Sequence, residues 1–130
     1  MIDHFGINCA DLDAAKRFYD GVLAVLGSRR LMDFDVAVGY GAEQPVFWSS
    51  GAAEGSSNRE AHIAFAAPDT ATVDEFHRVA LELGAESLHA PRLWPEYHPG
   101  YYGAFVRDPD GPFTSVTVPG NGGMEISRKR

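Results

Sequence analysis

Two histidines recur at matching places in the chain. His4 stands at the start of one apolar run and His62 at the start of a similar one, an offset of 58 positions (62 − 4). The same offset carries Asp11 onto Asp69. Imidazoles are common metal ligands and proton carriers. A duplicated unit therefore predicts two imidazoles at equivalent positions, which makes them candidates for metal or substrate contact in one shared cleft.

Both histidines are expected on the strand face that points away from the helices. In residues 1–10, His4 alternates with Phe5, Ile7 and Cys9, and side chains at successive strand positions point to opposite faces. The apolar residues are expected to pack against a helix, which leaves the imidazole on the other face. The alternative interpretation is a hydrogen-bonded structural histidine at each position.

Each half is expected to contain one strand, one amphipathic helix and several further strands. Helices are predicted over 11–26 and 69–83, because apolar residues recur at i, i+3 and i+4 after an aspartate that can cap the first turn. The strands are predicted over 1–10, 30–34, 36–40, 46–49, 61–67, 101–107 and 113–118.

Three segments without regular structure are expected between and after these elements. Residues 88–99 are rich in Pro, Trp, Tyr and His and are predicted as a loop over a pocket, and residues 108–111 are predicted as a tight turn. The small, polar run 50–58 marks the seam between the halves. We therefore expect one domain over 1–130, with module one at 1–58, module two at 59–118 and a C-terminal tail at 119–130.

The composition excludes several classes of protein. A chain of 130 residues, 45% hydrophobic and 22% charged, suits one globular domain. Its 11 basic and 18 acidic side chains give a net charge of −7, which repels nucleic acid and anionic lipid. Cys9 is the only cysteine, so no disulfide can form within the chain. We expect a cytoplasmic protein with no nucleic-acid partner and no membrane partner.

Six short motifs lie within residues 1–111: Asp3-His4-Phe5-Gly6-Ile7, Arg17-Phe18-Tyr19, Leu26-Gly27, His62-Ile63-Ala64-Phe65, Tyr102-Gly103-Ala104-Phe105-Val106 and Asp108-Pro109-Asp110-Gly111. Together they resemble the vicinal oxygen chelate superfamily of glyoxalases, bleomycin resistance proteins and extradiol dioxygenases. The resemblance implies an α+β fold of two βαβββ modules that form a curled mixed sheet around a cleft. It also implies a divalent metal held by residues from both modules.

The resemblance implies that His4 and His62 are metal ligands. The family's third ligand is usually a glutamate four positions after the glycine that ends the 108–111 motif, and that position is Ser115 in this chain. Glu125 lies in a similar local sequence ten positions later, where an insertion would deliver it instead. We therefore expect either a divalent ion (Zn, Fe, Mn or Ni) on His4, His62 and Glu125, or an incomplete site.

An apolar cleft with a few phenol groups suits a small-molecule ligand. The expected lining residues are Tyr40, Trp48, His98, Tyr101 and Tyr102. One interpretation is a metal-dependent lyase, isomerase or dioxygenase acting on a small oxygenated metabolite. The alternative is a metal-free drug-binding or metabolite-binding protein of the bleomycin-resistance type, for which the net negative charge favours a cationic ligand. The resemblance also implies a homodimer, in which a second chain completes the cleft or covers sheet edges.

Overall fold

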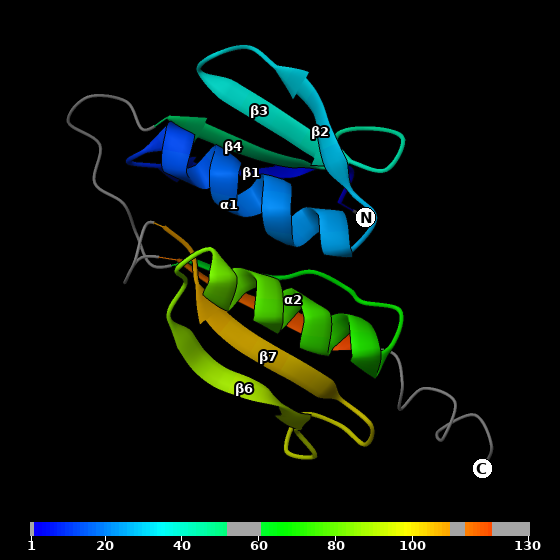
Figure 1. The fold of residues 1–130 in the computed structure, drawn as a ribbon. Coiled ribbons are helices and arrows are strands. Elements are labelled where there is room, and N and C mark those ends of the chain that lie inside the picture. The colour runs from blue at the N-terminus through cyan, green and yellow to red at the C-terminus, as the bar shows by residue number, and fades with distance from the viewer. Residues whose placement is uncertain (1, 52–60, 110–113, 121–130) are drawn as a thin grey trace.

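The structure is a computed structural model that describes residues 2–51, 61–109 and 114–120. The first part of the chain forms β1 (Phe5–Cys9), α1 (Leu12–Val25), β2 (Arg29–Asp33), β3 (Ala37–Gly41) and β4 (Phe47–Gly51). The second part forms β5 (Ala61–Ala64), α2 (Thr70–Glu82), β6 (Ser87–Leu93), β7 (Tyr102–Arg107) and β8 (Thr114–Gly120). The order of elements is the same in both parts (Figure 1).

Each part builds its own four-stranded mixed sheet, with the same strand order. The orders are β1-β4-β3-β2 and β5-β8-β7-β6, and in each sheet the first strand pairs in parallel with the last. The other pairs are antiparallel. This correspondence confirms the prediction of an α+β fold built from two βαβββ modules. The seam predicted at 50–58 falls largely on residues outside the described ranges.

The two helices begin at the two aspartates that the 58-residue offset relates. The Asp11 carboxylate accepts a hydrogen bond from the backbone N–H of Ala14, and the Asp69 carboxylate accepts one from the N–H of Thr72. Each cap satisfies a donor that the first helical turn leaves without a partner. The duplication therefore extends from the sequence to the start of each helix.

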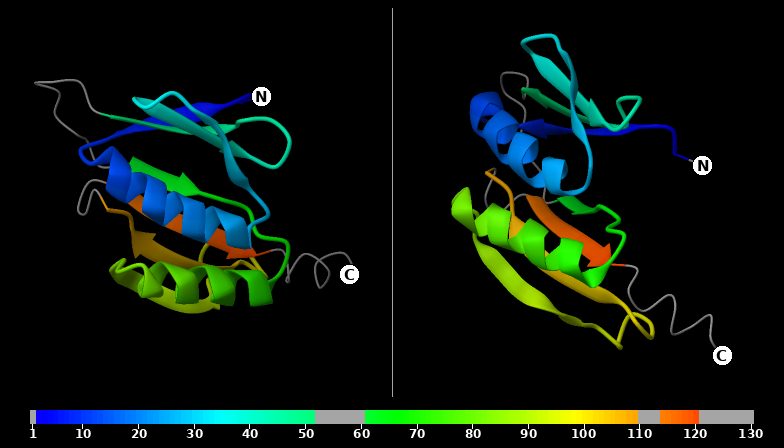
Figure 2. Two further views of the ribbon diagram at one scale, coloured as in Figure 1. Left: turned by 45° about the horizontal axis from the view of Figure 1, so that its top comes forward. Right: turned by 45° about the vertical axis from the view of Figure 1, so that its right-hand side comes forward.

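The helix-covered faces of the two sheets share one hydrophobic core. In the following, the inner face of a sheet is the one its helix covers, and the outer face is the opposite one. The rings of Phe47 in β4 and Phe65 after β5 meet at 5.2 Å between centroids, and Tyr19 of α1 packs against Phe47 at 4.9 Å. Figures 1 and 2 show α1 and α2 side by side, each against its own sheet. The outer faces therefore lie away from this common core.

One buried hydrogen bond links the modules directly. The Tyr19 hydroxyl, on α1, donates to Asp108 Oδ2 at the end of β7 over 2.7 Å, and both residues are buried. Asp108 begins the motif predicted as a tight turn, of which residues 110 and 111 lie outside the described ranges. The first residue of that motif thus ties the second sheet to the first helix.

The prediction of a loop over residues 88–99 is wrong for its first half. Residues 87–93 form β6, which pairs with β7 at the edge of the second sheet. Pro91 removes a backbone donor, and its strand accommodates it because the register shifts between His89 and Arg92. Proline is tolerated in edge strands and at such irregularities. A proline-rich composition therefore concealed an edge strand.

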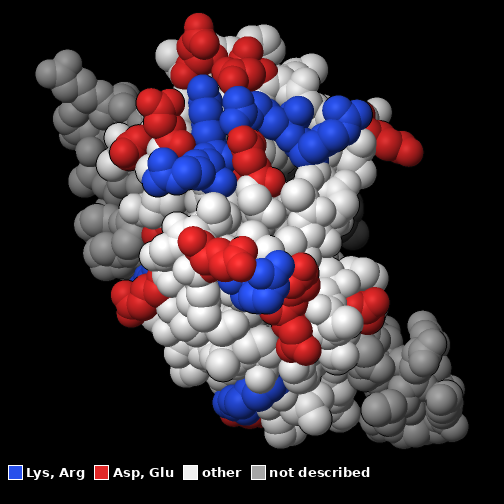
Figure 3. All heavy atoms as spheres, viewed as in Figure 1, with Lys and Arg blue, Asp and Glu red and all other residues white. Residues whose placement is uncertain are grey.

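The surface over the helices carries both signs of charge. Figure 3 shows acidic and basic side chains interspersed on this face. Arg78 of α2, for example, pairs with Glu75 and Glu82, and Arg30 pairs with Asp20 and Asp33. Among the described residues, no helix is long and apolar enough to cross a membrane.

Candidate functional site

The second sheet aligns His62 with two other residues in one row across three strands. His62 in β5 is the register partner of Ser115 in β8, and Ser115 is the partner of Arg107 in β7. We call these three residues the His62 row. Ser115 is the position at which the sequence resemblance places a glutamate ligand. The structure therefore puts that position directly beside His62.

The His62 side chain lies on the outer face. Its neighbour Ile63 is buried in the shared core, and strand alternation turns His62 the other way. The imidazole stacks on the ring of Phe105, with centroids 5.9 Å apart and planes 26° apart. Phe105 in turn alternates with the buried Ala104 and Val106, which fixes it on the same outer face.

Aromatic side chains continue from Phe105 across the outer face and onto the β6–β7 hairpin. We call the following six residues the aromatic cluster: His62, His89, Trp94, Tyr97, Tyr101 and Phe105. Their centroids are 5.4 Å apart for Phe105–His89, 4.9 Å for Phe105–Trp94, 5.7 Å for Trp94–Tyr97 and 5.1 Å for Tyr97–Tyr101. These separations are in the range of favourable ring contacts. The cluster therefore forms a continuous aromatic surface with an imidazole at one end.

Polar contacts hold the hairpin onto the sheet. The Trp94 indole N–H donates to the Gly103 carbonyl over 2.9 Å, and Trp94 is only 5% exposed. The guanidinium carbon of Arg92 lies 3.3 Å from the centroid of the Trp94 ring, and Arg92 also pairs with Glu96. These contacts fix the orientation of the indole before any ligand arrives.

Tyr101 presents a protonated phenol to this surface at neutral pH. Partial burial raises the pKa of Tyr101 above its ordinary value, and the neighbouring Tyr97 adds a smaller effect in the same direction. His98, which is exposed, packs its ring 5.0 Å from that of Tyr101, and its Nδ1 lies 3.0 Å from the Pro99 carbonyl oxygen. Of the predicted pocket residues, Tyr101 thus belongs to the aromatic cluster and His98 borders it.

Trp48 lies on the outer face of the other sheet. Its ring stacks on that of Phe34 at 6.1 Å with an interplanar angle of 5°, and a methyl group at Gly39 would lie 3.0 Å from its indole. His4 precedes β1, and alternation with the inner-facing Phe5 assigns it to the same outer face. The His4 side chain is 60% exposed, with Nδ1 2.8 Å from Asp3 Oδ1.

Tyr40 and Tyr102 lie on inner faces. Tyr40 is fully buried, and its hydroxyl donates to Asp20 Oδ1 over 2.9 Å. Burial, and then this hydrogen bond, raises the pKa of Tyr40. The Tyr102 hydroxyl donates to Asp74 Oδ1 of α2 over 2.7 Å, a bond that raises the pKa of Tyr102. The five residues predicted to line one pocket therefore do not share one face.

The described residues do not fit a divalent metal. Among residues 2–51, 61–109 and 114–120, no three His, Cys, Asp or Glu side chains come together. The His62 row consists of a histidine, a serine and an arginine, with no carboxylate among them, whereas the divalent ions of such sites are held by imidazole together with carboxylate. Glu125, the predicted carboxylate ligand, lies outside the described residues.

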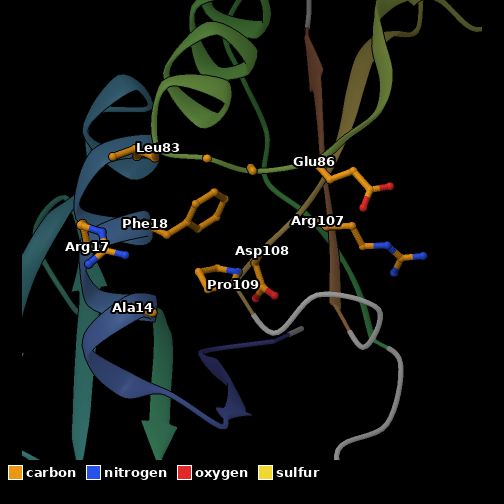
Figure 4. A pocket seen from close by; sticks show the side chains of 10 residues that line it. Ala14, Arg17, Phe18, Leu83, Glu86, Arg107, Asp108 and Pro109 are labelled. Atoms are coloured by element: carbon orange, nitrogen blue, oxygen red, sulfur yellow. The ribbon is translucent and has the colours of Figure 1, made fainter.

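A separate cavity of about 350 Å³ lies between the modules. Its walls include Phe18 of α1, Leu83 at the end of α2, and Pro109 after β7, and none of the predicted site residues is among them. Figure 4 shows the Phe18 ring directed into it, while the side chains of Glu86 and Arg107 extend together to the opposite side, away from Phe18. Glu86 and Arg107 also line this cavity, although the ends of their side chains extend away from the Phe18 ring.

Sequence reasoning misses three of the residues gathered around His62. Phe105, His89 and Arg107 come from strands whose register relative to β5 is set by pairing between distant segments. Of these three, only the position of Phe105 could have been predicted from the local sequence, because Phe105 alternates with the small apolar residues Ala104 and Val106, which face the core. A two-residue period in this run assigns Phe105 to the face that Tyr102 does not occupy.

Comparisons with known proteins agree with this fold. Residues 1–112 match the family model described as Glyoxalase/Bleomycin resistance protein/Dioxygenase superfamily. No curated protein matches the sequence. Similar solved structures include a glyoxalase/bleomycin resistance protein from Albidiferax ferrireducens, with 23% identity over 91% of this chain and 96% of that chain and a TM-score of 0.76.

Two further solved structures resemble the fold. Lactoylglutathione lyase from Agrobacterium tumefaciens is 24% identical over 92% of each chain, with a TM-score of 0.68. The fosfomycin resistance protein FosX from Mesorhizobium loti is 16% identical, over 98% of this chain and 95% of that chain, with a TM-score of 0.64. At these identities the likenesses show the fold alone.

Proposed function

The chain belongs to the Glyoxalase/Bleomycin resistance protein/Dioxygenase superfamily, and we propose that it is a small-molecule-binding protein that works without a metal ion. The ligand binds on the outer face of the second sheet, over the aromatic cluster. The observation that carries the proposal is the His62 row, in which a histidine, a serine and an arginine stand in register with no carboxylate, in a family that usually binds a divalent metal.

The aromatic cluster supports a ligand with an apolar, planar part. Phe105 lies at its centre with His62 stacked on it at one end, and the rings of Tyr97 and Tyr101 extend the surface along the hairpin. A ring packed against such side chains gains about 0.5–1.5 kcal/mol for each favourable pair beyond the burial of area. The exposed imidazole of His62 and the phenol of Tyr101 supply polar groups that orient the ligand.

A second copy of the chain completes the site in this proposal. The inner faces of the two sheets share one core, so the outer faces that carry His4 and His62 do not close on each other through that core. The first sheet also exposes apolar side chains that a partner would cover: Met32 is 42% exposed, Phe34 62% and Val36 72%. A homodimer would place such a surface over the aromatic cluster of the partner. Light scattering tests this, and a monomeric mass at micromolar concentration would contradict it.

Binding is tested with a neutral aromatic probe on protein treated with EDTA. Naphthamide should bind the metal-free protein, and Phe105→Leu should weaken that binding at least threefold, because the central ring of the cluster is lost. Leu81→Ala is the control, since Leu81 is 42% exposed and lies on α2, which covers the inner face. Equal weakening by both variants, or binding only after a divalent metal is added, would overturn the proposal.

A metal-dependent lyase, isomerase or dioxygenase is the second candidate. It is favoured by the equivalent positions of His4 and His62 in the duplicated modules, and it requires Glu125 to supply the carboxylate. Metal analysis of protein purified without added metal separates the two candidates. Stoichiometric Zn, Fe, Mn or Ni that Glu125→Ala removes would establish the second candidate, whereas Glu125→Ala should leave a metal-free binder unchanged.

A further inference from the structure

We propose that the ligand of this outer face carries a carboxylate, and that Arg107 binds it beside His62. The inference rests on the proposed function, because it names the chemical class of the ligand for the same site. It departs from the cationic ligand that the overall charge of −7 favours. The juxtaposition that carries it is a guanidinium and an imidazole on one face of the sheet, separated by one strand and beside an aromatic ring.

The register brings Arg107 and His62 within reach of one small group. They are separated by a single intervening strand, which places their Cα atoms about 10 Å apart. Both side chains stand on the outer face, as the burial of Ile63 and Val106 on the inner face requires. A planar carboxylate between them could accept two parallel hydrogen bonds from the guanidinium and one from the imidazole.

Within the row, the guanidinium of Arg107 is the group that suits an anion. Ser115, between His62 and Arg107, carries no charge, and the aromatic ring of Phe105 lies next to His62. Among the residues that the structure describes, Glu86 is an acid whose side chain extends on the same side as that of Arg107 (Figure 4). Glu96, further along the hairpin, already pairs with Arg92. Aromatic neighbours exclude water, which strengthens a charge-assisted hydrogen bond.

Two probes of the same shape test the charge requirement. Naphthoate carries a carboxylate where naphthamide carries a neutral amide. The dissociation constants of both can be measured by NMR titration on the full chain. We expect naphthoate to bind more tightly, and Arg107→Gln to weaken naphthoate about tenfold or more, as for a hydrogen bond to a charged group. Naphthamide binding should change less than twofold. Arg107→Lys should recover part of the naphthoate affinity, because it keeps the charge and loses the paired donors.

Arg78→Gln is the matched control, because it removes one positive charge from α2, which covers the inner face. It should leave the affinities for both probes unchanged. If Arg107→Gln weakens both probes equally, Arg107 has only a structural role and the inference is wrong. If naphthamide binds as well as naphthoate and Arg107→Gln changes neither, the inference fails while the proposed function stands. If neither probe binds, the proposed function fails with it.

Discussion

Replacing Tyr19 by phenylalanine removes the hydroxyl that links the two modules. That hydroxyl donates to Asp108 Oδ2 over 2.7 Å, and the exposed fractions are 0% for Tyr19 and 4% for Asp108. The substitution keeps the ring, which packs on Phe18, Tyr40 and Phe47. The change in stability therefore reports on the hydrogen bond and on the carboxylate that loses a donor.

The magnitude follows from burial. A hydrogen bond to a charged group contributes about 1.5–3 kcal/mol, and a buried acceptor that loses a donor costs a comparable amount. We therefore expect Tyr19→Phe to lower the free energy of unfolding by about 2 kcal/mol. The unfolding entropy scales with length, so for this chain that loss corresponds to a fall in Tm of about 7 °C.

Thermal and urea unfolding, followed by circular dichroism, measure the effect. Tyr97→Phe is the control, because Tyr97 is 55% exposed and its hydroxyl makes no hydrogen bond with any residue that the structure describes. A Tm within about 1 °C of wild type for Tyr19→Phe would correspond to well under 0.5 kcal/mol. That result would refute the structural role assigned to Asp108.

Three other predictions concern stability and metal binding. Burial lowers the pKa of His77, so the unfolded chain binds more protons than the folded one below about pH 6.5. The free energy of unfolding should therefore fall with acidification through this range. His77→Gln should make the urea midpoints at pH 7 and pH 5 more alike. Gly41→Ala should cost about 1–3 kcal/mol in urea unfolding, because its new methyl group would lie 1.8 Å from a backbone oxygen. Gly51→Ala, whose nearest such contact is 4.0 Å, should cost less. Ser115→Glu should raise the Ni²⁺ affinity of the protein at least tenfold in calorimetric titration, because it supplies the carboxylate that the His62 row lacks. An unchanged affinity would show that the His62 row cannot form a metal site.

The repeat made most of the fold predictable from the sequence. The 58-residue offset identified Asp11 and Asp69, which are the two N-caps, and apolar spacing identified both helices within a residue or two of their ends. These features depend on local chemistry. The edge strand β6 was missed because Pro91 is a strong local signal for a loop, whereas the pairing of its strand with β7 depends on a distant segment.

The candidate site was less predictable, because it depends on faces and register. Tyr40 and Tyr102 are aromatic residues close to the predicted pocket in sequence, yet both hydroxyls bind aspartates on the helix side. Phe105 and Arg107 reach His62 only through two successive strand pairings. A shift of one residue in either pairing would turn every side chain of that strand to the other face.

The most direct test of ligand binding over the aromatic cluster is an amide NMR titration of EDTA-treated protein with naphthamide. The largest chemical-shift changes should fall on His62, His89, Phe105 and the Trp94 indole N–H, without any added metal. Changes centred instead on Phe18 and Leu83 would assign binding to the cavity between the modules. That result, or a complete lack of shifts until a divalent metal is added, would contradict the proposed metal-free binding site.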